Sequence, residues 1–200
     1  MYELTTIETS VDSVLLKEKG SKFIGYAFPV HDENSMKTCL EAVKTEHPKA
    51  THHCHAFRIG LEGELHRAND DGEPAGSAGL PIYNQLLAHA VTNILLIVVR
   101  YYGGTKLGVS GLVKAYKETA KMTLESSKII TRELETELSA SFSFSQQHLI
   151  FTLLNKAGAQ ILEFESEHNC RIRAMVKLSQ KKSISEQLSE MLHVSFSFAN

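Results

Sequence analysis

A glycine-rich segment carries the densest group of chemistry-bearing residues in this 200-residue chain. It runs from Arg100 through Gly103 and Gly104 to Lys106 and Gly108. Paired glycines let a backbone turn sharply, and a helix that follows such a turn presents its free N–H groups to anions. The segment therefore predicts an anion or partner site. The structural alternative is a tight strand–helix connection whose arginine is paired internally.

Neighbouring side chains add to this predicted site. Tyr101 offers a ring on which a base or a partner's aromatic side chain can stack. Thr105 and Ser110 supply hydroxyl donors, while Arg100 and Lys106 supply positive charge for a phosphate. The spacing matches neither a Walker A loop nor a dinucleotide-binding fingerprint, so we expect no cofactor.

An acidic turn precedes that segment and holds Asp70, Asp71 and Glu73 around one glycine. Carboxylates suit Mg²⁺ or Ca²⁺, but the ordered spacing of an EF-hand loop is absent. We favour a structural turn in which the aspartates bond their own backbone. A loop that pairs with the basic segment through charge is a further alternative.

Histidines form the third group. His53 and His55 flank Cys54 in a predicted strand, so the two histidines share one face and the thiol lies on the other. Two ligands do not make a metal site, and no second pair has suitable spacing. We therefore expect no bound metal, and we assign no catalytic residue.

Hydrophobic periodicity predicts the elements that position these groups. Strands are expected over 13–17, 22–28, 51–60 and 94–99, and helices over 81–89 and 110–127. A further helix should be capped by Asn34 or Ser35 and stopped by Pro48. The continuous aliphatic run 94–99 is typical of a strand buried on both faces.

A second pattern begins near residue 135 and predicts two domains, 1–132 and 133–200. The later part reads as strand, helix, strand, strand, helix, strand, which is the ferredoxin-like βαββαβ order. Its first helix should be capped by Ser145, and its second should extend to Leu192. Arg171, Arg173 and Lys177 should lie on the open face of the sheet.

Composition and charge restrict the function. The chain is 42% hydrophobic and 22% charged, as globular proteins are. Its longest aliphatic run is far too short to cross a bilayer, no secretion signal is evident, and three scattered cysteines indicate reduced thiols. We expect a soluble cytoplasmic protein. With 21 basic and 23 acidic residues, any nucleic-acid contact needs a local basic patch.

The same residues resemble the signature of the IMPACT/YigZ family. The matching segments are 70–81, 98–108 and 111–116, with 21–23 and 53–56 as additional matches. Ser77 and Tyr102 stand where the family often has threonine and phenylalanine. The match adds Lys22 to the predicted binding residues.

This resemblance implies an α+β fold. The first domain would be an α/β sandwich with a mixed sheet, as in a small-subunit ribosomal protein and domain IV of elongation factor G. The second would resemble the ferredoxin-like domain V of that factor. Eukaryotic relatives regulate translation initiation by competing for an activator of a stress kinase. The second domain marks the bacterial type, for which nucleic-acid or ribosome binding is expected instead.

We therefore predict a non-enzymatic binding protein of the translation apparatus, with RNA, the ribosome or a translation factor as its partner and no membrane partner. The alternative is a hydrolase or phosphotransferase whose anion or metal site combines residues 70–73, His53, His55 and the loop 103–108. Convergence of these groups in one pocket would favour the enzyme. A third hypothesis is a protein-interaction module that uses the open face of the second sheet. The sequence does not indicate an oligomeric state.

Overall fold

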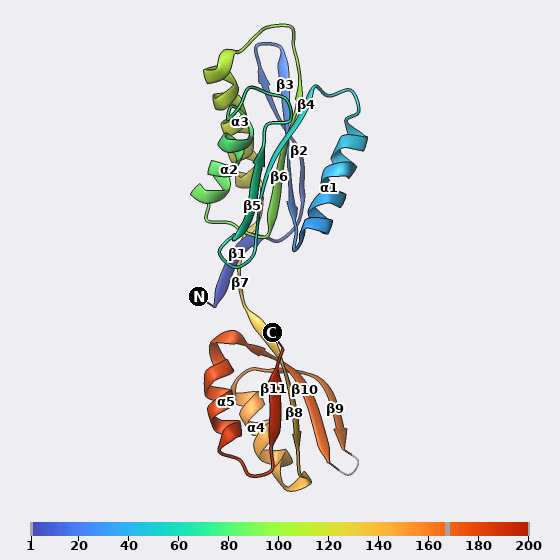
Figure 1. Ribbon diagram of the computed structural model, residues 1–200, viewed down its shortest axis with the longest axis vertical. Helices are drawn as coiled ribbons and strands as arrows, with labels where there is room; N and C mark the ends of the chain where they lie inside the picture. Colours follow the sequence, from blue (N-terminus) through green and yellow to red (C-terminus); the bar gives the residue numbers. More distant parts are fainter. Residues whose placement is uncertain (1, 167–168, 200) are drawn as a thin grey trace. The chain divides into compact units, whose positions relative to one another are not determined.

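The computed structural model describes residues 2–166 and 169–199 and forms two compact units, whose elements are labelled in Figure 1. The N-terminal unit comprises Leu4–Arg132, and the C-terminal unit comprises the chain from Glu133 onward together with the residues up to Glu3. Within the described ranges, no helix is long and apolar enough to cross a membrane.

Five strands of the N-terminal unit form one sheet in the order β2-β3-β6-β4-β5. Their bounds are Val11–Glu18 for β2, Ser21–Pro29 for β3, His52–Ile59 for β4, Leu65–Asn69 for β5 and Ile94–Tyr101 for β6. All four ladders of this sheet are antiparallel, so the expected mixed sheet is wrong. Strands β3 and β4 do run parallel, as a helical crossover requires, but β6 lies between them and is antiparallel to both.

Helices cover both faces of this sheet. Helix α1 (Glu33–Glu46) lies on one face, and α2 (Gly79–Ala88) and α3 (Gly108–Glu125) lie on the other (Figure 1). Helix α1 begins at a capping box in which Asp32 and Ser35 bond each other's backbone N–H groups. The predicted cap at Asn34 or Ser35 is therefore wrong by two or three positions. The buried residues of α1 recur at helical spacing and are Met36, Leu40 and Val43.

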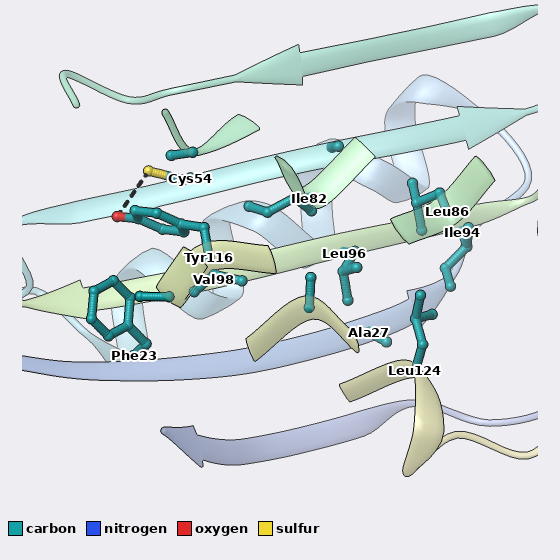
Figure 2. Packing of buried hydrophobic residues seen from close by; sticks show 14 of the residues in the cluster. Phe23, Ala27, Cys54, Ile82, Leu86, Ile94, Leu96, Val98, Tyr116 and Leu124 are labelled. Carbon is teal, nitrogen blue, oxygen red and sulfur yellow. Dashed lines mark hydrogen bonds between the residues drawn. The ribbon is translucent and has the colours of Figure 1, made fainter. Parts of the chain in front are cut away.

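The sheet separates two hydrophobic cores. Phe57 of β4 packs with α1 on one side, and Cys54 packs with α2 and α3 on the other. Figure 2 shows part of the second core, where Leu96 and Tyr116 lie among aliphatic side chains. Strand β6 contributes to both cores, which explains its unbroken aliphatic run.

A separate two-stranded sheet pairs the two ends of the N-terminal unit. Strand β1 (Glu3–Ile7) pairs with β7 (Ile129–Glu133). The Glu8 amide also donates to the Lys128 carbonyl at 2.9 Å. The sequence patterns did not predict β1, β7 or the exposed strand β5.

The C-terminal unit is a four-stranded sheet with two helices, in the predicted element order. Its elements are β8 (Glu135–Phe142), α4 (Gln147–Lys156), β9 (Gln160–Ser166), β10 (Cys170–Lys177), α5 (Lys181–Ser189) and β11 (Ser195–Phe198). The strand order is β11-β8-β10-β9, and all three ladders are antiparallel. Two single-turn 3₁₀ helices, Phe144–Gln146 and Leu178–Gln180, precede α4 and α5.

Strand β10 alternates as predicted, because its buried residues are Cys170, Ile172, Ala174 and Val176. Arg171 and Arg173 lie exposed between them, and Lys177 is half-buried at the end of the strand. Two helix predictions are wrong. Ser145 lies inside the first 3₁₀ turn and does not cap α4, and α5 ends before Leu192, which is 76% exposed.

Candidate functional site

A buried ion pair joins the acidic turn to strand β6. Arg100 Nη1 lies 2.6 Å from Glu73 Oε1, and the two side chains are only 6% and 4% exposed. The Tyr116 hydroxyl of α3 donates to the same carboxylate oxygen at 2.8 Å. Charge pairing between the acidic turn and the basic segment was one of the alternatives drawn from the sequence. The geometry contradicts the phosphate contact predicted for Arg100, because its guanidinium is paired and shielded from solvent.

Two aromatic rings contact the same guanidinium. Arg100 Cζ lies 5.5 Å from the ring centroid of Phe23 and 5.5 Å from that of Tyr102. Such cation–π contacts are favourable, and more so where the cation is desolvated. Arg100 therefore positions Tyr102 at the start of the glycine-rich segment.

Both aspartates of the acidic turn accept hydrogen bonds from backbone N–H groups. Asp70 accepts N–H bonds from Gly76, Ala78 and Gly79 at 2.8, 3.0 and 2.8 Å. Burial raises the pKa of the Asp70 carboxyl, but these backbone donors outweigh burial and hold its pKa below the ordinary value. Asp71 accepts the His53 backbone N–H at 2.6 Å. These bonds fasten the acidic turn to the start of α2 and to β4.

The sheet divides the predicted histidines from the acidic turn's buried carboxylate. His53 and His55 share the α1 side of β4 with Phe57, and Cys54 lies on the opposite side. Burial lowers the pKa of His55, which keeps its imidazole neutral. Across 2–166 and 169–199, no three His, Cys, Asp or Glu side chains are grouped as metal ligands. Part of the convergence that would favour an enzyme is present, because His53 Nδ1 lies 3.7 Å from Asp71 Oδ2 and His52 Nε2 lies 3.8 Å from Glu73 Oε1.

Cys54 is a buried thiol on the same side of the sheet as the ion pair. Its sulfur lies 3.3 Å from the Tyr116 hydroxyl, drawn as a dashed line in Figure 2, and 3.0 Å from the Asp70 carbonyl oxygen. Burial raises the pKa of the thiol far above its ordinary value. Cys54 is therefore protonated at neutral pH, and it serves as a small packing residue.

The glycine-rich segment rests on the turn between β2 and β3. A Cβ on Gly103 would lie 1.9 Å from the carbonyl carbon of Gly20, so only glycine fits there. The Gly103 amide also donates to Ser21 Oγ at 3.2 Å. Beyond this contact the segment is exposed, including Thr105, Lys106, Gly108 and Ser110. The close approach places the β2–β3 turn directly beside the predicted anion-binding residues.

These contacts border a surface hollow of about 360 Å³, which we call the tyrosine pocket. Its lining residues are Gly20, Lys22, Ile24, His47, Tyr101 and Tyr102. Lys22 and Tyr101 are direct partners in the β3–β6 ladder, which brings together two residues predicted separately. Tyr102, which directly precedes Gly103, is 47% exposed.

Hydrogen bonds fix one wall of the tyrosine pocket. His47 Nδ1 lies 2.9 Å from the Tyr101 hydroxyl, and His47 Nε2 lies 2.5 Å from the Tyr26 hydroxyl. Burial raises the pKa of Tyr26 to about 12, so its hydroxyl remains protonated. Sequence reasoning missed His47, Gly20 and Ile24. The only local signal was a histidine directly before Pro48 at a helix end.

Comparison with known proteins decides the family. Residues 19–124 match the family model described as the Impact N-terminal domain, which is more than half of the chain. The chain belongs to the IMPACT family. It is 32% identical over 180 residues to the IMPACT family member YigZ of Escherichia coli, with 89% of this chain and 88% of that protein covered. It is thus a YigZ-type bacterial member of the IMPACT family over nearly its whole length.

Solved structures match as well. A structure described as that of a hypothetical protein superposes with a TM-score of 0.72 at 30% identity, covering 99% of this chain and 97% of that chain. A structure of the two-domain translational regulator Yih1 matches with a TM-score of 0.41 at 27% identity, covering 60% of this chain and 48% of that chain. The region matched to the IMPACT family model contains the acidic turn, the glycine-rich segment and the tyrosine pocket.

Proposed function

We propose that this IMPACT family member is a binding protein of the translation apparatus that contacts single-stranded RNA at the tyrosine pocket. The observation that carries the proposal is the pairing of Lys22 with Tyr101 across adjacent strands, next to the exposed ring of Tyr102. A cation beside two tyrosines is the combination by which proteins bind a phosphate and a stacked base together.

The pocket has room for one base. Its volume of about 360 Å³ is comparable with that of small-ligand sites. Arg100 holds Tyr102 from the protein side, so the other face of the ring can remain available for stacking. Tyr101 is ordered by its bond to His47, which reduces the entropy lost on binding.

Several exposed lysines lie near the pocket, although Glu46 lies 3.6 Å from His47 and the chain has a net charge of −2. Lys17, Lys19 and Lys22 lie exposed on β2, the turn after it and β3, and Lys106 lies in the exposed segment that rests on this turn. With Arg100 buried, these lysines supply the phosphate contacts in its place. The proposal therefore keeps Lys106 from the sequence analysis and transfers the role of Arg100 to Lys22.

The relatives, the C-terminal unit and the cysteines are consistent with a protein that acts in translation. The family resemblance implies translation-linked roles for eukaryotic relatives and, for the bacterial type, nucleic-acid or ribosome binding. The C-terminal strand order β11-β8-β10-β9 is the one that a ferredoxin-like domain has, and we propose that this unit is such a domain, of the elongation factor G domain V type. Free thiols at Cys39, Cys54 and Cys170 suit a reducing, cytoplasmic setting.

The experiment is a salt titration with fluorescein-labelled oligouridine of about twelve nucleotides, followed by anisotropy. Each phosphate contact contributes about 0.7 to the slope of log affinity against log salt for a single strand. Lys22→Ala/Lys106→Ala should therefore lower the slope by about 1.4. Tyr102→Ala should weaken binding by about 1–3 kcal/mol and leave the slope unchanged, because stacking is not ionic.

The matched control is Lys156→Ala/Lys182→Ala, which removes the same charge from the C-terminal unit and should leave the slope as in the wild type. Co-sedimentation with ribosomes then tests whether the protein binds the translation apparatus. An unchanged slope in Lys22→Ala/Lys106→Ala, together with unchanged affinity in Tyr102→Ala, would refute RNA binding at this pocket.

A further inference from the structure

A second concave site lies between helices α2 and α3, on the face of the sheet opposite α1 and the tyrosine pocket. This α2–α3 groove has a volume of about 230 Å³. Leu80, Asn84 and Gln85 of α2 and Val113 and Lys117 of α3 line it. Neither the acidic turn's ion pair nor the tyrosine pocket uses these side chains.

Gln85 gives the groove an unpaired polar group. The residue is only 7% exposed, yet its side-chain amide makes no hydrogen bond to any residue within 2–166 and 169–199. In that part of the chain, the completely buried side-chain atoms without a partner are Arg58 Nε and Arg100 Nε. The Gln85 amide therefore keeps some exposure to solvent, and Gln85 is one of the residues that line the groove. A largely desolvated amide without a partner is unfavourable, and a ligand that both accepts and donates would satisfy it.

The groove walls are aliphatic and exposed. Leu80 is 50% exposed on α2, and Leu87 of the same helix is 46% exposed two turns later. Val109, one turn before Val113 on α3, is 57% exposed. Leu80 and Val113 line the groove itself, and Leu87 and Val109 extend the exposed aliphatic surface of the two helices beyond its lining residues.

Positive charge marks one end of the groove. Lys117 lines it and forms no ion pair with the described part of the chain, and Lys114 lies exposed on the preceding turn. An acidic side chain on the occupant would complement these lysines. Among the described residues, no aromatic side chain lines the groove, so a base has no ring there to stack on, which disfavours RNA.

We propose that the α2–α3 groove binds a peptide segment of a partner protein, with aliphatic side chains against Leu80 and Val113, a polar or main-chain amide on Gln85 and a carboxylate on Lys117. The amide of Gln85 has a carbonyl acceptor and an NH₂ donor, which is the complement of a peptide group. A protein partner at this groove and RNA at the tyrosine pocket would let one IMPACT domain bridge the two.

The test uses synthetic peptides of about twelve residues that carry two aliphatic positions and one Asp or Glu, with the remaining positions randomised. The library is screened against the full chain, and the best binder is labelled for anisotropy. Gln85→Leu and Val113→Asp should each weaken that peptide at least about tenfold. Lys117→Ala should weaken binding of the acidic peptide. It should not weaken binding of the matched peptide in which Asp or Glu is replaced by Asn or Gln.

Control variants separate this site from folding and from the RNA site. Gln85→Leu should leave the melting temperature unchanged or raised, because the amide bonds no residue in the described part of the chain. Tyr102→Ala and Leu192→Ala should bind the peptide as the wild type does. Failure to enrich any peptide, or equal binding by Gln85→Leu and Val113→Asp, would overturn the proposal. So would concentration-dependent dimerisation that Val113→Asp abolishes, since the occupant would then be a second copy of the chain.

Discussion

Glu73→Ala offers the sharpest test of how the acidic turn is held. The substitution leaves the Arg100 guanidinium, 6% exposed, without its carboxylate partner. Removing one member of a buried ion pair costs about 3–5 kcal/mol, because the remaining charge stays desolvated. The Tyr116 hydroxyl loses its acceptor as well, although the Cys54 sulfur remains within 3.3 Å of it. We therefore expect a loss of about 4 kcal/mol in the free energy of unfolding of the N-terminal unit, a large share of the roughly 5–15 kcal/mol typical of a domain.

Urea unfolding followed by tyrosine fluorescence measures this loss. The chain has no tryptophan, and five of its six tyrosines lie between Tyr26 and Tyr116, so the signal reports the N-terminal unit. Glu125→Ala breaks an exposed pair with Lys121 in the same unit and should change stability by only about 0.5 kcal/mol.

The double variant Glu73→Gln/Arg100→Met isolates the cause. It removes both charges, so no bare ion stays buried, and it should be clearly more stable than Glu73→Ala alone. The reasoning fails if Glu73→Ala lies within about 1 kcal/mol of the wild type, or if the double variant is no better than the single one.

Two further predictions follow from the same region. Gly103→Ala should lower the melting temperature by more than Gly104→Ala does. The new Cβ at position 103 would lie 1.9 Å from the Gly20 backbone. A Cβ at position 104 would have no described atom within 4 Å, so Gly104→Ala costs only about 1 kcal/mol for the left-handed backbone. Calorimetry on both variants decides the point, and equal melting temperatures would contradict the close contact. The lowered pKa of Asp70 means that its carboxylate stabilises the fold fully above its unfolded pKa of about 4, and that this stability is lost as the pH falls through the folded-state value. Asp70→Asn should therefore be less stable than the wild type at neutral pH, and its free energy of unfolding should fall less as the pH is lowered below about 4. An unchanged pH dependence in the acid range would count against the role of the backbone donors to Asp70.

Local patterns predicted the C-terminal unit well because its signals are local. The alternation from Cys170 to Val176 fixed both the strand and its buried face, and the two helices showed clear apolar spacing. Strand β5 escaped prediction because all five of its residues are exposed and show no alternation.

The candidate site was predicted in composition but not in arrangement. The glycine-rich segment and Lys22 were both identified, yet their meeting depends on β3 pairing with β6, which no periodicity reveals. Arg100 looked like a phosphate ligand because its partner, Glu73, lies 27 residues earlier in the chain. Only the three-dimensional course of the chain distinguishes a paired arginine from an exposed one.

The pairing of β1 with β7 has a consequence for how the protein is made. Roughly 120 residues separate Ile7 from Ile129, so at about 5–20 residues per second the first strand leaves the ribosome about 6–25 s before its partner. During that interval the edge of β1 is open to wrong pairing and to proteases. A nascent chain that stops before Ile129 would contain every residue of the tyrosine pocket and still lack β7, the strand that pairs with β1.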